Sequence, residues 1–541
     1  QRARSAFRLF SASNSEVLIN RVYCGIRAIG EMCTDVTGSP VLGGGSWPRG
    51  SGDGYIFNSG LQVTATISPT AVFGGTGRSW AGDTVGTWFM DPTGGLQSGE
   101  QITEIFNSAA TRFSAADGDA NWPSAAYVKD TTLYNSVLIG RRTVGQQDLW
   151  WRYWDGNPNQ TAGRGHPAGI LAETRILGWN FPSGNEDIAY FITRFFNITA
   201  DGSTAAGRAM YDGLARYGYT TGEIDEIAAI GTRFQRLNEP KFGIVIPDTG
   251  YALDNAFAAI FTDDDEADFE KNFSTVFLPF DMGATYVSDW TGLASWSYPE
   301  NIFRPPFAVA PGLVGIKFLK TPTNPLTGLE FGLTIWSATS NGAPFDDAES
   351  IQQQYRNHRG TNDPALGDWP CTVSDPPGRQ LCGLPTVPRD ARYFASSGPF
   401  DMNPGETQVF VTARVFAPGV ASAVTPWIGA PSPAMLPGTP PGPGRLTTAQ
   451  DSVRDIDRAA GWVSFSDANA DGRITQYEVT TVPQSLLHKS LVAQAIFDSR
   501  FLLPSAPESP NFFLVPGDDQ VTVVWQASST EQTGDPYFQA G

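Results

Sequence analysis

A run of twelve residues near the C-terminus has the residue types and spacing of a calcium-binding loop. Residues 467–478 read DANADGRITQYE. Ca²⁺ binds about six to eight oxygen atoms, and a loop of this length supplies them from positions 1, 3, 5, 7, 9 and 12, the last as a bidentate carboxylate. The sequence therefore predicts a Ca²⁺ site whose ligands are Asp467, Asn469, Asp471, the main-chain carbonyl of Arg473, Thr475 and Glu478. The alternative is an accidental match in a polar loop.

Apolar residues at helical spacing predict helices on both sides of this loop, over residues 447–465 and 485–501. Pro483 ends the helix that leaves the loop early, because proline removes a backbone donor and fixes φ. This departure from the usual EF-hand pair resembles the dockerin arrangement. No second loop of this kind follows in the sequence, so cooperative calcium sensing is not expected.

The four cysteines fall into two short-range pairs, Cys24 with Cys33 and Cys371 with Cys382. Neither pair has the CxxC spacing of a zinc site, and local pairs of this kind are typical of disulfides formed in an oxidising compartment. We therefore expect two disulfides and a secreted protein, with free buried thiols as the alternative. The chain begins at Gln1 rather than Met, from which we expect a mature form whose export signal has been removed.

Few residues suit catalysis. Histidine occurs at three positions only, His166, His358 and His488, and no GxSxG, HExxH or phosphate-binding glycine motif is present. The acidic run 263–266 and the pair Glu186 and Asp187 would suit a glycosidase if two carboxylates stood about 5 to 9.5 Å apart. A solvated charge run or a turn acid explains them more simply. No catalytic residue is therefore predicted.

An aromatic cluster is the other candidate binding feature. It consists of Trp150, Trp151, Tyr153 and Trp154, whose rings could stack on sugars. Strand alternation would place Trp151 and Tyr153 on one face and Trp150 and Trp154 on the other, and one of these faces must belong to the core. Packing or a subunit contact is therefore the favoured interpretation.

The composition favours a mostly β protein that does not bind nucleic acid. Only 17% of the 541 residues are charged, while Gly, Pro and aromatic residues are plentiful, a balance typical of β-rich chains. The net charge of −19 repels phosphate backbones and favours cations. No apolar run approaches the ~20 residues of a transmembrane helix.

Periodicity locates several elements. Alternation at period two predicts a strand over residues 60–69, and a longer apolar run predicts a central strand over 188–199. Helical spacing of apolar residues predicts helices over 99–113, 223–237 and 347–359.

A chain of this length is expected to form several domains. The proline-rich segment 430–445 cannot form a helix or a ladder and reads as a linker. We expect multi-domain β-sandwiches with a small helical calcium-binding insert near the C-terminus, divided into a β-rich domain (1–237), a β-sandwich (238–429), the linker (430–445), a helical calcium module (446–505) and the start of a further β domain (506–541).

Two resemblances support this organisation. Residues 510–525, PNFFLVPGDDQVTVVW, resemble the opening strands of a fibronectin type III domain. Residues 389–419 and the strings NRVYCGIR and GNEDIAYFITRFFNIT are similar to a family of uncharacterised, secreted, β-rich bacterial proteins that end in fibronectin type III or sorting domains. This resemblance implies secretion but no activity.

We therefore expect a secreted structural protein, a subunit of a bacterial surface filament or layer that self-assembles through β-strand contacts and is stabilised by Ca²⁺ and disulfides. The N-terminal segment 1–20 and the strands within 510–525 are the segments expected to pair between subunits. The alternative is a secreted carbohydrate-active enzyme or an adhesion protein that binds a polysaccharide or cell surface.

Overall fold

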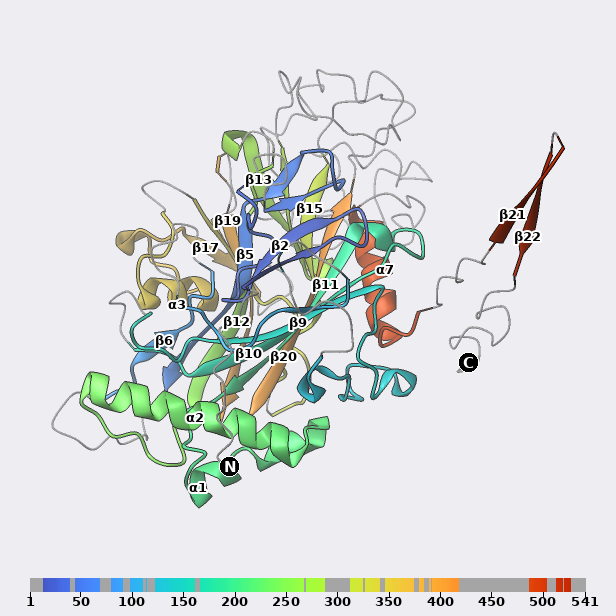
Figure 1. Ribbon diagram of the computed structural model, residues 1–541. Coiled ribbons are helices and arrows are strands. Elements are labelled where there is room, and N and C mark those ends of the chain that lie inside the picture. Colours follow the sequence, from blue (N-terminus) through green and yellow to red (C-terminus); the bar gives the residue numbers. More distant parts are fainter. Residues whose placement is uncertain are drawn as a thin grey trace, which may run out of the picture.

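Strands that are buried at nearly every position build two large sheets, which pack face to face as a sandwich (Figure 1). The computed structural model describes residues 13–38, 44–68, 79–90, 98–109, 113, 122–160, 166–266, 269–287, 312–324, 326–340, 346–373, 379–383, 389–390, 392–417, 486–503, 512–518 and 520–526. The mostly β class expected from the sequence is confirmed.

The larger sheet has nine strands and runs through the centre of the molecule. In spatial order it contains β13 (Asn272–Phe277), β14 (Met282–Val287), β15 (Leu313–Lys320), β20 (Thr407–Ala417), β11 (Ile188–Asn197), β10 (Ile170–Gly178), β9 (Gln147–Trp154) and β7 (Glu100–Gln101), with β8 (Phe106–Asn107) also paired to β9. All ten residues of β11 are buried, which confirms the central strand expected over residues 188–199.

The smaller sheet has seven strands and includes the strand expected over residues 60–69. Its spatial order is β17 (Cys371–Val373), β18 (Gln380–Cys382), β16 (Ile335–Thr339), β19 (Arg392–Met402), β12 (Leu253–Asp263), β5 (Asn58–Ile67) and β6 (Thr84–Gly86). Phe195 of the larger sheet contacts Phe400 of the smaller, with ring centroids 6.0 Å apart. The main core therefore lies between the two sheets.

A sheet of four short strands is formed by β1 (Asn14–Val17), β2 (Tyr23–Arg27), β3 (Gly45–Ser46) and β4 (Gly54–Ile56). Val17 is buried, and the whole of β1 pairs with β2. Residues 14–20 therefore belong to the folded body, which corrects the expectation that the whole segment 1–20 is available to pair between subunits. Residues 1–12 lie outside the described part of the chain.

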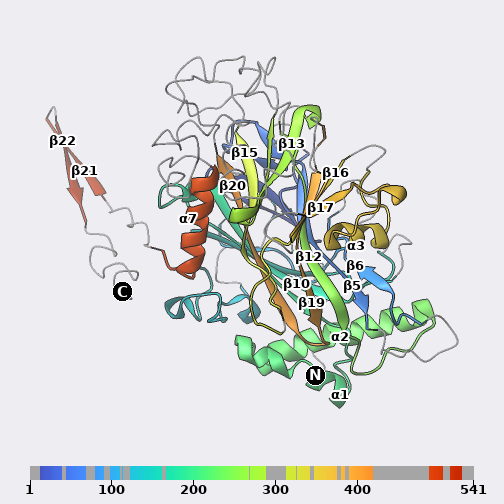
Figure 2. The same ribbon diagram turned by 180° about the vertical axis from the view of Figure 1, so that it is seen from behind.

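Three of the expected helices are confirmed. They are α2 (Thr221–Phe242), α3 (Ile351–Arg359) and α7 (Leu486–Asp498), and α1 (Ala205–Ala209) precedes α2. Figures 1 and 2 show α3 beside the smaller sheet and α7 beside the larger, on opposite sides of the sandwich, with α2 across one end. The helix expected over residues 447–465 lies outside the described residues.

The helix predicted over residues 99–113 is wrong. This segment contains β7 and β8, which both pair with β9. Ile105 and Phe106 are buried, but the edge of β9 pairs with Glu100–Gln101 and Phe106–Asn107 as short strands. Tertiary pairing has overridden a weak helical pattern.

The domain boundary expected between residues 237 and 238 is also corrected. β5 pairs with β12 across that position, and β11 pairs with β20. Residues 1–237 and 238–429 therefore contribute strands to the same two sheets. The linker 430–445 lies outside the described residues.

A separate two-stranded sheet lies near the C-terminus. β21 (Phe512–Gly517) pairs with β22 (Gln520–Trp525) as a hairpin. In Figures 1 and 2 it stands apart from the sandwich.

Candidate functional site

The predicted calcium loop lies outside the described residues. Asp467, Asn469, Asp471, Arg473, Thr475 and Glu478 all fall within residues 418–485, so this Ca²⁺ site stays a prediction. The helix expected after the loop is α7, whose buried Lys489 fixes it to the larger sheet. Nζ of Lys489 donates to Oδ2 of Asp187 at 2.5 Å and to the carbonyl of Phe416 at 3.2 Å.

Asp187 is a structural anchor rather than a reactive acid. Its Oδ1 accepts a hydrogen bond from the Trp47 indole at 2.6 Å and lies 3.3 Å from the guanidinium of Arg21. Both Asp187 and Lys489 are fully buried, and burial lowers the pKa of Lys489 although the charge of Asp187 opposes that shift. The glycosidase interpretation of Glu186 and Asp187 therefore finds no support in this geometry.

Both expected disulfides are present. Cys24 is bonded to Cys33, and Cys371 on β17 is bonded to the residue opposite it on β18, Cys382. Each closes a short loop, and the lost chain entropy of the unfolded state stabilises the fold by about 2–3 kcal/mol.

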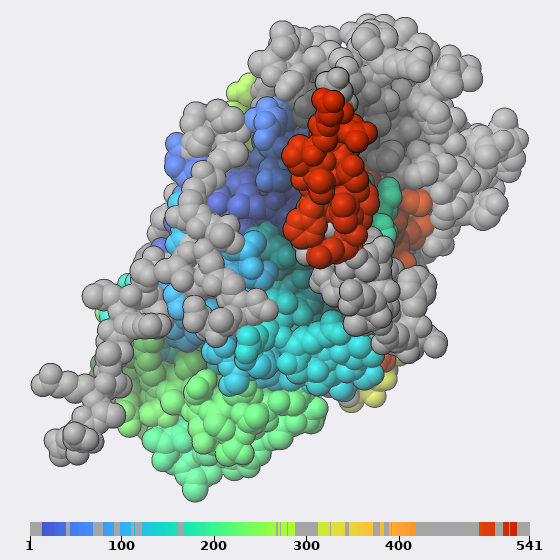
Figure 3. All heavy atoms as spheres, turned by 45° about the vertical axis from the view of Figure 1, so that its right-hand side comes forward, coloured from blue at the N-terminus to red at the C-terminus, as the bar shows by residue number. Residues whose placement is uncertain are grey.

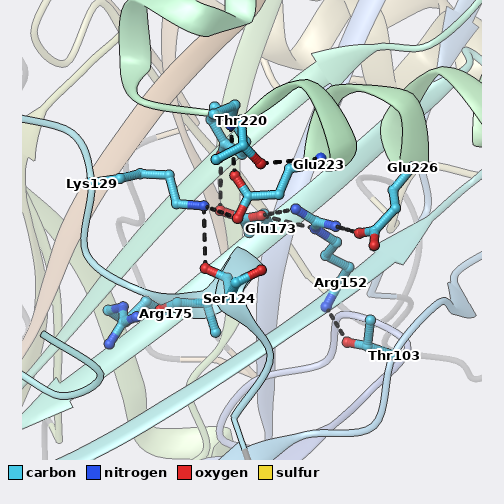
Figure 4. Close-up of polar contacts among 11 residues, drawn as sticks. Thr103, Ser124, Lys129, Arg152, Glu173, Arg175, Thr220, Glu223 and Glu226 are labelled. Carbon is cyan, nitrogen blue, oxygen red and sulfur yellow. Dashed lines mark hydrogen bonds and ion pairs between the residues drawn. The ribbon is translucent and has the colours of Figure 1, made fainter. Parts of the chain in front are cut away.

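A charged cavity, which sequence reasoning missed, lies on the face of the larger sheet that is turned away from the smaller one. Arg152 of β9, Glu173 of β10 and Arg194 of β11 stand opposite one another in register. Nε of Arg152 donates to Oε2 of Glu173 at 2.8 Å, and the Tyr219 hydroxyl donates to Oε1 at 2.9 Å. Glu226 of α2 lies 3.7 Å from the other side of the Arg152 guanidinium (Figure 4).

Residues 125–134 form a segment that covers this cavity, and a further ion pair holds it in place. Lys129 contacts Glu223 at 2.8 Å, and Glu223 also completes the capping box of α2 with Thr220 (Figure 4). Burial alone would raise the pKa of Glu223, but the hydrogen bonds from Lys129 and Thr220 lower it. The Lys129–Glu223 pair thereby joins the covering segment to the first turn of α2.

Charge balance and volume decide what this cavity can do. The three cations that line it each have a carboxylate partner: Lys129 with Glu223, Arg175 with Asp148, and Arg194 with Asp130. The neighbouring Arg152 pairs with Glu173. The cavity volume is about 50 Å³, room for a few water molecules. A cavity of this size, bordered by ion pairs, leaves room for water molecules and none for a larger substrate. The sequence feature that could have revealed this cavity is the presence of charged residues within strands that are otherwise largely apolar: Arg152, Glu173, Arg175 and Arg194.

The aromatic cluster is buried on both faces of β9. The exposed fractions of Trp150, Trp151, Tyr153 and Trp154 are all 2% or less. Stacking on a sugar is therefore excluded at this cluster. A surface groove of about 630 Å³ runs along α1 and α2, and the described residues that line it include charged groups such as Arg208 and Asp225 but no aromatic residue.

Two of the three histidines pack in the interior. His166 stacks on Trp80 with ring centroids 3.8 Å apart, and its Nε2 lies 3.2 Å from Asp83. His358 is fully buried, and its Nδ1 lies 2.9 Å from the hydroxyl of Thr64. Burial lowers the pKa of His358 to about 3, so this imidazole is neutral at physiological pH.

The hairpin β21–β22 is the most exposed apolar feature of the described residues. Strand alternation and register place five large apolar residues on one of its faces: Phe512, Leu514, Val521, Val523 and Trp525. Their exposed fractions run from 41% for Val523 to 65% for Trp525. The hairpin faces the viewer uncovered in Figure 3, where it is the red surface at the front.

Comparison with protein-family models and with curated proteins finds no match to this chain. Among the described helices, none combines the length and the apolar character needed to cross a membrane.

Proposed function

We propose that this chain is a secreted structural protein that assembles with further copies of itself through the β21–β22 hairpin. The observation that carries the proposal is the exposed apolar hairpin. An isolated two-stranded hairpin is marginally stable in water, and both of its faces carry large apolar side chains. Contiguous apolar surface of this kind marks an interaction site.

The charge distribution favours a second copy as the partner. The chain carries a net charge of −19, so most surfaces of two copies repel each other. Neither β21 nor β22 contains a charged residue. The acidic residues of the hairpin are confined to its turn, at Asp518 and Asp519, so two copies can meet along its strands without juxtaposing like charges. The strands also leave backbone donors and acceptors free for strand addition.

The two disulfides support the secreted context, because such bonds persist in oxidising compartments. The Ca²⁺ expected at residues 467–478 would stabilise the helical segment that precedes the hairpin. We also propose that the hairpin corresponds to the opening strands of a fibronectin type III-like domain.

A double substitution that introduces a pair of opposite charges tests the role of the hairpin. Leu514 and Val523 stand opposite each other in the hairpin, so Leu514→Lys with Val523→Glu removes apolar surface while a cross-strand ion pair maintains the register. The matched control is Leu326→Lys with Leu329→Glu, because these residues are 94% and 70% exposed on a turn of the sandwich.

We expect the weight-average mass of the wild type, measured by light scattering in Ca²⁺, to rise with concentration. The control should behave like the wild type, and the hairpin variant should remain at the monomer mass. A wild type that stays monomeric over the whole concentration range, or a hairpin variant that assembles as the wild type does, would refute the proposal.

A further inference from the structure

Three aspartates meet where β12 ends and β19 begins. Asp263 is the last residue of β12, Asp265 follows two residues later, and Asp390 lies two residues before Arg392, the first residue of β19. Asp263 and Arg392 are opposite each other in the β12–β19 ladder. One carboxylate oxygen from each aspartate lies within 4.8 Å of the other two.

These aspartates have buried oxygen atoms without hydrogen-bond partners. Asp263 is completely buried, and its Oδ1 has no donor among the described residues. Oδ1 of Asp265 and Oδ1 of Asp390 are in the same condition. A buried carboxylate oxygen without a partner is costly, and three of them in one cluster indicate a missing positive ligand.

The basic residues nearby do not neutralise the cluster. Arg392 is its one ion-pair partner among the described residues, and it is shared: Nε lies 3.0 Å from Asp263 and Nη2 lies 3.1 Å from Asp390. The same guanidinium also pairs with Asp347. With Asp265 included, four carboxylates face one guanidinium.

The neighbouring Asp264, by contrast, has hydrogen-bond and ion-pair partners for its buried carboxylate. Asp264 is equally buried, but it accepts hydrogen bonds from the hydroxyls of Thr262 at 2.5 Å and Thr285 at 2.9 Å, and it lies 3.4 Å from Arg414. The acidic run 263–266 is thus not the solvated charge run that the sequence favoured.

We infer that Asp263, Asp265 and Asp390 form a cation site, separate from the loop at residues 467–478, whose ligand is Ca²⁺. Ca²⁺ binds carboxylate oxygens at about 2.3–2.6 Å, so two oxygens on one ion are at most about 5 Å apart. The cluster satisfies that limit. Burial and the charge of Asp390 raise the pKa of Asp265 to about 6, which agrees with excess negative charge at this place.

This site lies at the junction of the two central strands of the smaller sheet. A bound ion would link the end of β12 to the start of β19, which are far apart in the sequence. The inference does not depend on the proposed assembly through the hairpin.

Calcium titration of the full chain tests the inference in a background that lacks the predicted loop site. Glu478→Gln with Asp467→Asn removes two carboxylates of that loop. In this background, calorimetry with CaCl₂ should still detect binding of one ion per chain. Adding Asp265→Asn, or Asp390→Asn in a second variant, should weaken that binding at least tenfold.

A stability measurement distinguishes lost binding from a damaged fold. Asp265 forms no ion pair with any described residue, so Asp265→Asn should relieve repulsion and raise the unfolding midpoint in EDTA. In Ca²⁺ the order should reverse, because only the chain with Asp265 gains the ion. Absence of calcium binding in the loop-deficient background, or undiminished binding by both aspartate variants, would overturn the inference.

Discussion

At the scale of single residues, burial determines which polar groups can react. His358 is enclosed by the helix α3 and the smaller sheet, and the Phe394 ring lies 4.9 Å away between centroids. Asp187, Asp264 and the carboxylates around the charged cavity are each held by named donors. The residue types that suggested chemistry in the sequence are thus mostly committed to structure.

His358 should make the fold sensitive to mild acid. Its pKa is lowered by burial to about 3 in the folded protein, against 6.5 for an ordinary histidine, so below pH 6.5 the unfolded chain binds a proton that the folded chain does not. Stability is therefore fully present above that pH and falls by up to about 1.4 kcal/mol for each pH unit below it.

Urea unfolding at pH 7, 6, 5 and 4 measures this dependence. His358→Gln should show a shallower loss of stability between pH 6.5 and 4 than the wild type, whatever its absolute stability. Parallel pH profiles of the two proteins would contradict the assignment.

At the scale of elements, single side chains fix whole helices to the sheets. α2 is positioned by its capping box and by the Lys129–Glu223 pair, and α7 by the buried Lys489–Asp187 pair. α7 begins at Leu486, soon after the predicted calcium loop ends at Glu478. The Lys489–Asp187 pair therefore fixes the chain to the sandwich close to that loop.

Lys489→Met should destabilise the protein by about 3–5 kcal/mol, because it leaves the buried charge of Asp187 with the Trp47 indole and one partly exposed cation, Arg21. Adding Asp187→Asn should recover much of the loss, since no buried charge then remains. Equilibrium urea unfolding of both variants checks this.

The control is Gln494→Ala, which changes an exposed contact on the same helix and should alter stability by less than ~0.5 kcal/mol. A Lys489→Met variant as stable as that control would contradict the role of the pair.

At the scale of the whole molecule, the sandwich is one cooperative body, since β5 and β11 find their partners in β12 and β20. A fragment of residues 1–237 should not fold alone, because it leaves both of those strands without their neighbours. Near-ultraviolet circular dichroism of the fragment should lack a tertiary signal, and co-expression with residues 238–541 should restore it. A folded 1–237 fragment would show that the two parts are independent.

Much of the local structure could be predicted from the sequence, and most of the long-range structure could not. The run 188–199 is apolar enough to be a buried strand in any context, and Cys371 and Cys382 are close enough to pair locally. The helical spacing over residues 99–113 failed because β9 offers backbone partners that no local pattern reveals. Asp390 reaches Asp263 only through the β12–β19 ladder, so the acidic cluster was not visible as a site in the sequence.

The outermost strands of the sandwich have a consequence for its behaviour at high concentration. Of the four outermost strands described in the two large sheets, β7 is two residues long, β6 and β17 are three residues each, and β13 is six residues long. The Cys371–Cys382 bond joins β17 to β18. The three short edges are poor templates for amyloid-like growth, which requires long rows of unpaired backbone groups, and β13 is the longest of the four edges. Assemblies formed through the proposed hairpin contact should therefore dissolve on dilution, and any fibril growth of the sandwich itself should start at β13.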